Sequence, residues 1–347
     1  MTASPERPTL DQVAARAGVG RGTVSRVING SSQVSERTRQ TVLAAVTELG
    51  YVPNLAARAL VTRRTDTVAL VVSESEDRLF GEPFFAGVVR GISAGVTAAG
   101  RQLVLALTAG QDGERPIERY LTRQHVDGVL LLSLHGDDPL PRQLRDRGLP
   151  VVIGGRPSGG YSGAYVDVDN TGGARAGVAH LLERGRRRIA TITGPLDMMA
   201  GQDRLAGYRT ALADAGRPVE DSLVEAGDFS EVSGQQAMHA LLARAPEVDA
   251  VFAANDLMAV GAMRALREAG RRVPDDVAVL GFDDSPLSRV TDPPLSTVRQ
   301  PTDEMGRRMA ELLLRLIATD DDGTGAAENP EQLRTVLPTE LVVRSST

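Results

Sequence analysis

The sequence predicts an α/β protein with a small all-α N-terminal head and a larger, doubly wound α/β body. Three short amphipathic helical patterns fill the first 50 residues, and from residue 68 onward apolar strand patterns alternate with helical ones. Alternation of this kind is typical of parallel sheets that are covered by helices. A chain of 347 residues, 41% of them hydrophobic, is also too long for one compact domain and suits a small head joined to a two-lobed body.

The first two predicted helices form a helix-turn-helix. Thr9 and Gln12 have the spacing of a capping box, and Gly18 ends the helix that they begin. After a turn, a second helix is expected over Arg21–Asn29, with its aliphatic residues facing inward and its arginines facing out. A third helix, capped by Ser35 and stopped by the glycine at position 50, completes one small core. Two short helices joined by a glycine-containing turn, the second with a polar outer face, indicate a DNA reader.

The distribution of charge supports a nucleic-acid partner for the head. Residues 1–64 contain nine arginines and four acidic residues, a balance of +5, whereas the whole chain has a formal net charge of −6, which leaves −11 for the rest. A basic head on an acidic body indicates that the head alone binds a polyanion.

Composition excludes several classes of site. All 39 basic residues are arginine, so a P-loop and Schiff-base catalysis both lack their lysine. There is no cysteine for a disulfide or a thiolate metal site, and the four histidines (125, 135, 180 and 239) lack metal-ligand spacing and are expected at the surface or in packing. The sequence shows neither a secretion signal nor an apolar run of about 18 residues. We therefore expect a cytoplasmic protein without a metal or cofactor, and not an enzyme.

Four motifs in the first third of the chain occur together: Thr9–Ala14, Gly18-Val19, Thr23–Asn29 and Leu49–Asn54. They resemble the start of a lac repressor (LacI/GalR) family transcription regulator. The match is dense over about fifty residues, and shorter motifs continue it more loosely to the C-terminus.

The resemblance places Arg21, Gly22 and Arg26 at the base-reading positions of the second helix. Arginine pairs with guanine through two hydrogen bonds, whereas Gly22 offers no side chain for readout. Other polar side chains suit phosphate contacts that set the register, and three of them also cap helices. This second set is Thr9, Thr23, Ser25, Asn29, Ser35, Thr38 and Asn54, and Arg58 is added as a DNA contact in the hinge.

A short hinge helix is expected after Asn54, over residues 55–61. It is well below the ~12–15 residues that an isolated helix needs, so it should be ordered only when something packs on it. The resemblance implies that hinge helices of two subunits pair in the minor groove, with Leu60 wedged into the central base step and kinking the duplex. The plain alternative is a surface helix that links two domains.

The resemblance also implies a body of periplasmic-binding-protein type, with two doubly wound lobes and three crossings, which we place near residues 166, 298 and 330. The expected domains are the head at 1–50, the hinge at 51–65 and the body at 66–347. The first lobe takes about 66–166 and 299–330, and the second about 167–298 and 331–347. Residues 320–330 read as a mobile surface loop and 337–344 as one strand, with no leucine-heptad extension after it, so a dimer is expected. Expected strands are 68–72, 103–107, 126–132, 151–153, 189–193, 250–253 and 277–281; expected helices include 84–99, 171–184, 204–215, 230–242 and 256–269.

Polar groups that follow these strands predict a ligand pocket, because open parallel sheets bind ligands beyond the carboxyl ends of their strands. The family pattern assigns effector contact to Arg204, Asn255 and Asp283, a stacking aromatic to Phe229, and the lining of the other lobe to Phe84 or Phe85. Arg156 is either a further contact or a salt-bridge partner between the lobes. The two phenylalanines Phe229 and Phe85 are core residues in the plainer interpretation, Asp256 is an N-cap and Asp284 a turn former. At Gly155 many sugar-binding members carry an acidic residue, so one hydroxyl-binding carboxylate is missing there.

These patterns predict a dimeric transcription repressor of a palindromic operator, controlled by a small effector, a sugar or a related polar metabolite, that binds between the lobes and shifts a conformational equilibrium. Whether the effector induces or corepresses is left open. The alternatives are a solute-binding transport component, against which the basic helical head speaks, and an enzyme with a DNA-binding head, for which no catalytic motif is found.

Overall fold

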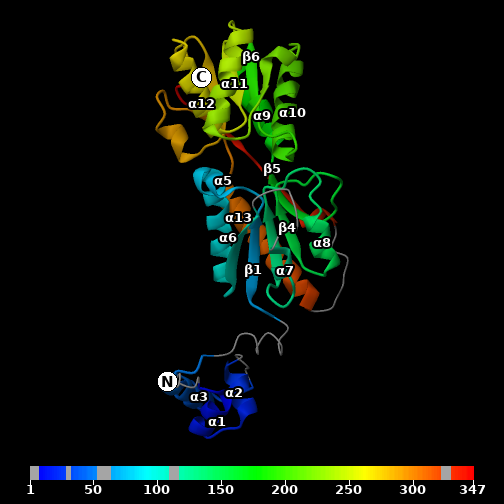
Figure 1. The fold of residues 1–347 in the computed structure, drawn as a ribbon, viewed down its shortest axis with the longest axis vertical. Helices are drawn as coiled ribbons and strands as arrows, with labels where there is room; N and C mark the ends of the chain where they lie inside the picture. The colour runs from blue at the N-terminus through cyan, green and yellow to red at the C-terminus, as the bar shows by residue number, and fades with distance from the viewer. Residues whose placement is uncertain (1–7, 29–32, 53–63, 109–116, 322–329) are drawn as a thin grey trace, which may run out of the picture. The chain divides into compact units, whose positions relative to one another are not determined.

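The computed structural model describes residues 8–28, 33–52, 64–108, 117–321 and 330–347. It divides into two compact units, the first ending at residue 65 and the second comprising residues 66–347. The first unit is the head and the second unit is the body (Figure 1).

The head consists of three described helices: α1 (Leu10–Ala17), α2 (Arg21–Ile28) and α3 (Glu36–Leu49). As predicted, Thr9 and Gln12 form a capping box, in which the Thr9 hydroxyl accepts from the Gln12 amide at 3.3 Å and the Gln12 side chain accepts from the Thr9 amide at 2.8 Å. Gly18 and Gly50 end α1 and α3 in the left-handed conformation that glycine adopts without strain. The three helices bury a small core made of Val13, Ala14, Val24, Val27, Val42 and Ala45.

The body contains two six-stranded sheets, which define its two lobes. The first sheet has the order β11-β5-β4-β3-β1-β2 and is parallel throughout. The second has the order β12-β10-β9-β8-β6-β7, and only its edge strand β12 is antiparallel to its neighbour. The strands of the first lobe are β1 (Thr67–Val72), β2 (Gln102–Leu107), β3 (Gly128–Leu132), β4 (Val151–Gly154), β5 (Ala164–Val168) and β11 (Arg334–Leu337). Those of the second lobe are β6 (Ile189–Thr193), β7 (Val224–Ala226), β8 (Ala250–Ala253), β9 (Ala278–Asp283), β10 (Ser296–Arg299) and β12 (Glu340–Val342).

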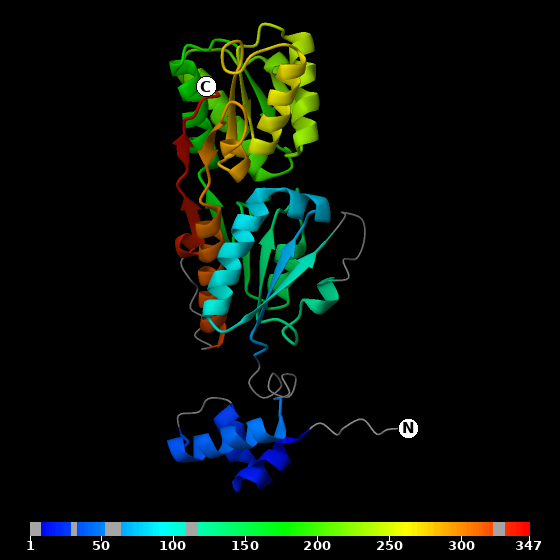
Figure 2. The ribbon, with the colours of Figure 1, turned by 90° about the vertical axis from the view of Figure 1, so that its left-hand side faces the viewer.

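Helices cover both faces of each sheet, and apolar clusters lie beneath them. In the first lobe, α6 and α13 run side by side (Figures 1 and 2). They approach closely because glycines face the contact: a Cβ added at Gly91 of α6 would lie 2.1 Å from the carbonyl oxygen of Asp303. The first lobe has α5 (Glu76–Gly81), α6 (Pro83–Ala98), α7 (Ile117–Tyr120), α8 (Leu140–Asp146) and α13 (Thr302–Asp321), with the 3₁₀ turn 330–333. The second has α9 (Asn170–Glu183), α10 (Met199–Asp214), α11 (Glu231–Arg244) and α12 (Asp256–Glu268), with 3₁₀ turns at 221–223 and 286–289.

The chain crosses between the lobes three times, after β5, after β10 and after β11. The first two crossings lie close to the predicted positions. The third prediction was wrong: residues 334–337 form β11 and pair with β5 of the first lobe, so the chain crosses after Leu337 and not near 330. Pro338 has no amide hydrogen to donate to a sheet, so β11 ends there and the single strand expected over 337–344 is divided. Figure 2 shows β11 and β12 as two separate red arrows.

The seven strands expected between residues 68 and 281 are present, with ends that differ by up to two residues, and the five expected helices are present as well. The expected beginning of the helix at 204 was five residues late, because α10 starts at Met199. The strands β5, β7 and β10 and the 20-residue helix α13 were not predicted. The expected hinge helix and most of the expected loop at 320–330 lie outside the described residues, although α13 continues to Asp321.

Candidate functional site

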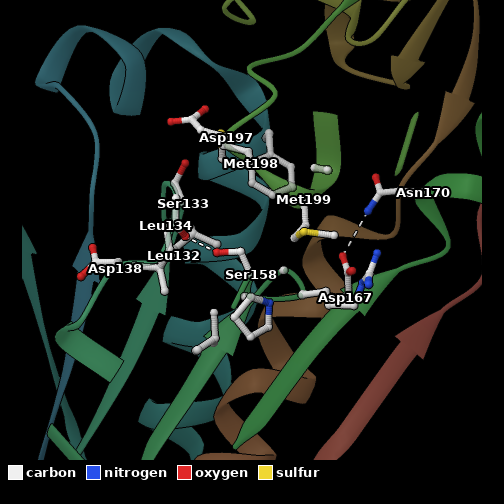
Figure 3. Close-up of a pocket in the computed structure, with 18 of the residues that line it drawn as sticks. Leu132, Ser133, Leu134, Asp138, Ser158, Asp167, Asn170, Asp197, Met198 and Met199 are labelled. Atoms are coloured by element: carbon white, nitrogen blue, oxygen red, sulfur yellow. Dashed lines mark hydrogen bonds between the residues drawn. The ribbon is translucent and has the colours of Figure 1, made fainter. Parts of the chain in front are cut away.

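The candidate effector site is a cleft between the two lobes that is open to solvent. Its walls come from the carboxyl ends of β3, β4 and β5 in the first lobe and from the segments after β6, β7 and β9 in the second. Figure 3 shows Asp138 and Leu134 at one end of the cleft, Asp167 and Asn170 at the other, and Ser158 between them. As expected for parallel sheets, polar groups gather where the strands end.

Arg204 is the buried cation of this cleft. It lies in the second turn of α10, where its Nε donates to Asn170 Oδ1 at 2.9 Å and its Nη1 donates to the carbonyl oxygen of Ala254 at 2.5 Å. Its guanidinium is also 3.9 Å from the centroid of the Phe282 ring. Burial lowers the pKa of Arg204, and Asp283 opposes that shift. A planar donor held in this way presents its remaining N–H groups in fixed directions.

Asp283 faces Arg204 from the end of β9, with 3.6 Å between Oδ1 and Nη1. Gln300 donates to the same oxygen. Burial raises the pKa of Asp283 to about 7, and Arg204 opposes this rise. Asp283 has a φ of 114°, which lies in the region that favours glycine, so the turn that aims its carboxyl group into the cleft is strained.

Phe229 also has a positive φ, 71°, and its ring lies near two guanidinium groups. Arg78 of the first lobe and Arg204 of the second are each 5.7 Å from the ring centroid. This aromatic belongs to the core of the second lobe, as in the plainer interpretation, and it also lines the cleft; its stacking on an effector stays a prediction. Phe84 and Phe85 form an edge-to-face pair at 5.4 Å, and both line the cleft, but Phe85 is only 1% exposed and is mainly a core residue.

Asn255 was predicted to contact the effector, but it is not among the residues that line the cleft. It caps α12, where its Oδ1 accepts from the Met258 amide at 2.9 Å and its Nδ2 donates to the Phe229 carbonyl at 2.8 Å. Its side chain is therefore occupied inside the lobe and holds the strained backbone of Phe229. Asp256, expected to be the N-cap, is instead the first residue of the helix and accepts from the Ser285 amide at 2.7 Å.

Asp284 is a structural residue, in agreement with the plainer interpretation. Its carboxylate accepts from Arg299 at 2.8 Å and from Arg344 at 2.5 Å. Arg156 forms the salt bridge between lobes that was one of its two predicted roles: its Nη2 is 2.5 Å from Oδ1 of Asp203 in α10, and it also lines the cleft.

Sequence reasoning missed several polar residues of the cleft: Arg78, Glu82, Asp167, Asn170 and Gln300. Glu82 accepts from Arg78 at 3.1 Å; burial raises its pKa to about 7, and Arg78 opposes that rise. Burial also raises the pKa of Asp167. The alternating pattern that ends in Asp167 could have located β5 and with it Asp167 and Asn170. Gly155 lines the cleft at a φ of 93°.

On the head, the described DNA-contact candidates lie on the outer face of α2 and at helix N-termini. Arg21, Gly22 and Arg26 are exposed, whereas Val24 and Val27 of the same helix are buried. Thr23 and Ser25 are half-buried. Thr9 and Ser35 are N-caps, and the Ser35 and Thr38 hydroxyl groups are 2.8 Å apart. The predicted contacts Asn29, Asn54, Arg58 and Leu60 lie outside the described residues.

Among the residues that the structure describes, no group of three or more His, Asp or Glu side chains could hold a metal ion. No described helix is both long enough and apolar enough to cross a membrane.

A basic helix-turn-helix head and a two-lobed α/β body with a polar cleft define a class of protein: transcription regulators that bind a ligand. Comparison with known proteins agrees. Residues 9–54 match the model of bacterial regulatory proteins of the lacI family, and residues 178–347 match that of a periplasmic binding protein-like domain. The chain is 58% identical to the HTH-type transcriptional regulator CelR of Thermobifida fusca over 343 residues, covering 98% of each chain. It is 38% identical to the ribose operon repressor of Escherichia coli strain K12, covering 89% of this chain and 93% of that one.

Solved structures show the same likeness. A CelR–cellobiose complex has a TM-score of 0.76 at 55% identity and covers 98% of this chain and 100% of its own. A lac repressor dimer bound to operator and an anti-inducer has a TM-score of 0.83 at 30% identity and covers 99% of both chains. The chain therefore belongs to the lacI family of bacterial regulatory proteins. It is a DNA-binding transcription repressor with a ligand-binding body.

Proposed function

We propose that the protein is a homodimeric repressor of a palindromic operator and that its effector is an uncharged sugar, a glucose disaccharide such as cellobiose. The observation that carries the choice of sugar is the composition of the cleft, which is lined by carboxyl and guanidinium groups and by the aromatic ring of Phe229. Sugars offer hydroxyl groups to the former and a C–H face to the latter. The protein acts where its operator DNA is, in the bacterial cytoplasm.

The charges of the cleft favour a neutral ligand. Six acidic and four basic side chains line it, and each of the four arginines already has a carboxylate partner. A phosphorylated or carboxylated ligand would therefore meet no unpaired arginine among the lining residues. A neutral polyol meets acceptors and donors without that penalty.

Two polar groups of residues, one at each end of the cleft, support a ligand with two rings. Arg204, Asn170 and Asp167 lie at one end. Asp138 lies at the other, near a turn in which Arg142 donates to the Gly159 carbonyl at 2.9 Å. The relative with 55% identity was solved as a complex with cellobiose, a disaccharide, which is consistent with this division.

The proposed DNA mechanism follows from the head and from the hinge sequence. Arg21 and Arg26 of α2 read bases in the major groove, and Leu60 enters the minor groove at the centre of the operator. An effector that contacts both lobes changes the population of closed bodies and thereby the spacing of the two hinge segments in a dimer. A coupling free energy of about 1–3 kcal/mol would change operator affinity roughly 5- to 150-fold.

The experiment is a selection of operator sequences with the full-length protein, followed by fluorescence anisotropy of the selected duplex. Titration with cellobiose should change operator affinity at least fivefold, whereas glucose, ribose and a purine base should change it less. A sequence preference without a cellobiose response would reject the proposed effector and retain the repressor. Binding of all duplexes with equal affinity would reject both.

A further inference from the structure

The two lobes are joined at the rim of the cleft by His135, outside the set of residues assigned to effector contact. His135 follows β3 of the first lobe, and Asp197 precedes α10 of the second. The ring atom Nδ1 of His135 is 2.8 Å from Oδ2 of Asp197, and the next amide, that of Gly136, donates to the Asp197 carbonyl at 2.9 Å. Asp197 is labelled in Figure 3 beside Ser133 and Leu134 of the first lobe. Both contacts require the lobes to be close.

The other ring nitrogen of His135 faces a buried carboxylate. Nε2 is 3.1 Å from Oε1 of Glu74, whose side chain is only 6% exposed. The same oxygen accepts from Ser133 at 2.6 Å and from Arg78 at 2.7 Å. Burial works to raise the pKa of Glu74, but its hydrogen bonds and Arg78 lower it overall, so Glu74 is ionised. Two carboxylate acceptors on one imidazole require two N–H donors, which only the protonated ring has.

Glu74 connects His135 to the effector cleft. Arg78 spans Glu74 and Glu82, with Nη2 3.1 Å from Glu82, and its guanidinium faces the Phe229 ring of the second lobe. Loss of the proton from His135 therefore removes a positive charge beside Glu74, the carboxylate that holds Arg78 at the cleft. Contacts therefore run without a break from Asp197 through His135, Glu74 and Arg78 to Phe229, and both end residues belong to the second lobe.

We propose that His135 is a positioning residue for the effector cleft: in its protonated form it joins Glu74 of the first lobe to Asp197 of the second, so closure of the lobes takes up a proton. The proposal concerns the regulation of the proposed effector site. Only its test with cellobiose rests on the proposed function. The mechanism requires that the lobes separate and close around the cleft that they share.

The sign of the effect follows from the neighbours of His135. The hydrogen bond with Glu74 raises the pKa of His135, burial opposes it, and Asp197 adds to the rise. Opening removes Asp197, so the open form holds the proton less tightly. Closure is therefore favoured at low pH and weakened as the pH rises through the pKa of the closed form. Asp137 and Asp138 line the adjoining hollow that His135 also lines.

Glu82 and Asp283 also titrate near pH 7, so the pH profile of the wild type alone does not identify His135. The test compares His135→Gln with two other variants. Asp197→Asn removes the same contact from the opposite lobe. His239→Gln is the matched control, because His239 pairs with Glu268 at 2.9 Å inside the second lobe, between α11 and α12.

The first measurement needs no effector. The chain has no cysteine, so spin labels can be placed at Asp146→Cys of α8 and Ala213→Cys of α10, both exposed and on different lobes. Electron–electron double resonance should show that the distance between labels in full-length protein lengthens between pH 6 and pH 8.5. His135→Gln and Asp197→Asn should each give the longer distance already at pH 6, and His239→Gln should match the parent. Equal distances and equal pH responses in all four proteins would overturn the proposal.

The second measurement uses cellobiose as the probe. Calorimetric titration at pH 7.5 in buffers of different ionisation enthalpy should show that part of the proton uptake on binding is lost in His135→Gln, together with roughly a three- to tenfold weaker affinity at pH 6. Proton uptake identical to that of the parent would overturn the proposal. If cellobiose does not bind, the proposed effector is wrong, and the label distances still decide the role of His135.

Discussion

The guanidinium of Arg204 and the carboxyl group of Asp283 lie 3.6 Å apart on the floor of the cleft, and both side chains are more than nine-tenths buried. The pair joins α10 to the end of β9, and both residues line the cleft from the second lobe. Breaking it leaves a buried carboxyl group without its cation, a change that typically costs about 3–5 kcal/mol when both groups are charged. The protonation of Asp283 near pH 7 reduces that cost.

We therefore expect Arg204→Ala to abolish the effector response of operator binding while operator binding itself survives. Its free energy of unfolding should fall by about 2 kcal/mol. Arg209→Ala is the control, since Arg209 is an exposed arginine on the same helix. Fluorescence anisotropy with and without effector measures the response, and urea unfolding measures stability. A full effector response in Arg204→Ala would show that Arg204 is not part of the effector site.

Glu82→Gln should change the pH dependence of stability. The folded protein raises the pKa of Glu82 from 4.5 to about 7. The stabilisation that comes from protonation of Glu82 is therefore complete below pH 4.5, and it is lost as the pH rises through 7. Glutamine has no such dependence. The variant should therefore gain stability relative to the wild type between pH 5 and pH 8, by about 2 kcal/mol in total. Urea unfolding at several pH values tests this, and a constant difference would contradict the raised pKa.

Arg156 and Asp203 should be coupled across the lobes. Their salt bridge is short, but the Arg156 side chain is 42% exposed, so water screens the interaction. A double-mutant cycle with Arg156→Ala and Asp203→Ala should give a coupling of about 0.5–1 kcal/mol in the free energy of effector binding. The exposed pair of Arg175 and Asp214, within the second lobe, provides a matched cycle with no expected coupling to binding. Equal couplings in the two cycles would argue against a role for the bridge in closure.

Arg21→Ala should weaken binding to the selected operator by about 1–3 kcal/mol and relax the sequence preference at one base pair of each half-site. Arg16→Ala removes the same charge from the head but from an arginine that pairs with Glu48 between α1 and α3. It should leave the sequence preference unchanged. Competition with single-base variants of the operator distinguishes the two protein variants. Indistinguishable specificity profiles would show that Arg21 contributes charge only.

Leu60→Ala tests the prediction made from the hinge sequence, which lies outside the described residues. An apolar wedge unstacks a base step and kinks the duplex, so its loss should reduce both operator affinity, by about tenfold, and the bend angle of the bound DNA. Gel mobility of circularly permuted operator fragments measures the bend. Unchanged affinity and unchanged bending would exclude the wedge.

The sequence predicted the head almost to the residue because its signals are local. The capping box at Thr9 and the left-handed glycine at position 18 depend only on neighbours along the chain. In the body, Arg204 and Asp283 were found from motifs next to strand ends. Arg78 and Glu82 were missed because they belong to a short helix, and only tertiary packing brings that helix to the cleft.

Asn255 shows that a correctly placed residue can still have a side-chain direction that the sequence does not predict. Its motif and its position after β8 were both read correctly, but the direction of its side chain depends on the strained carbonyl of Phe229, which it binds. The third crossing was misplaced because 334–337 has the same apolar alternation whichever sheet it joins. Pairing with β5 is a long-range contact that no local pattern specifies.

The order in which the chain passes between its lobes has a consequence for synthesis on the ribosome. The first lobe needs α13 and β11, which are translated after β6 to β10 of the second lobe. About 130 residues of the second lobe therefore emerge while the strands β1 to β5 still lack a covering helix and an edge strand. The nascent first lobe exposes apolar surface for that whole interval, so its yield in cells should depend on chaperones that bind it before translation ends.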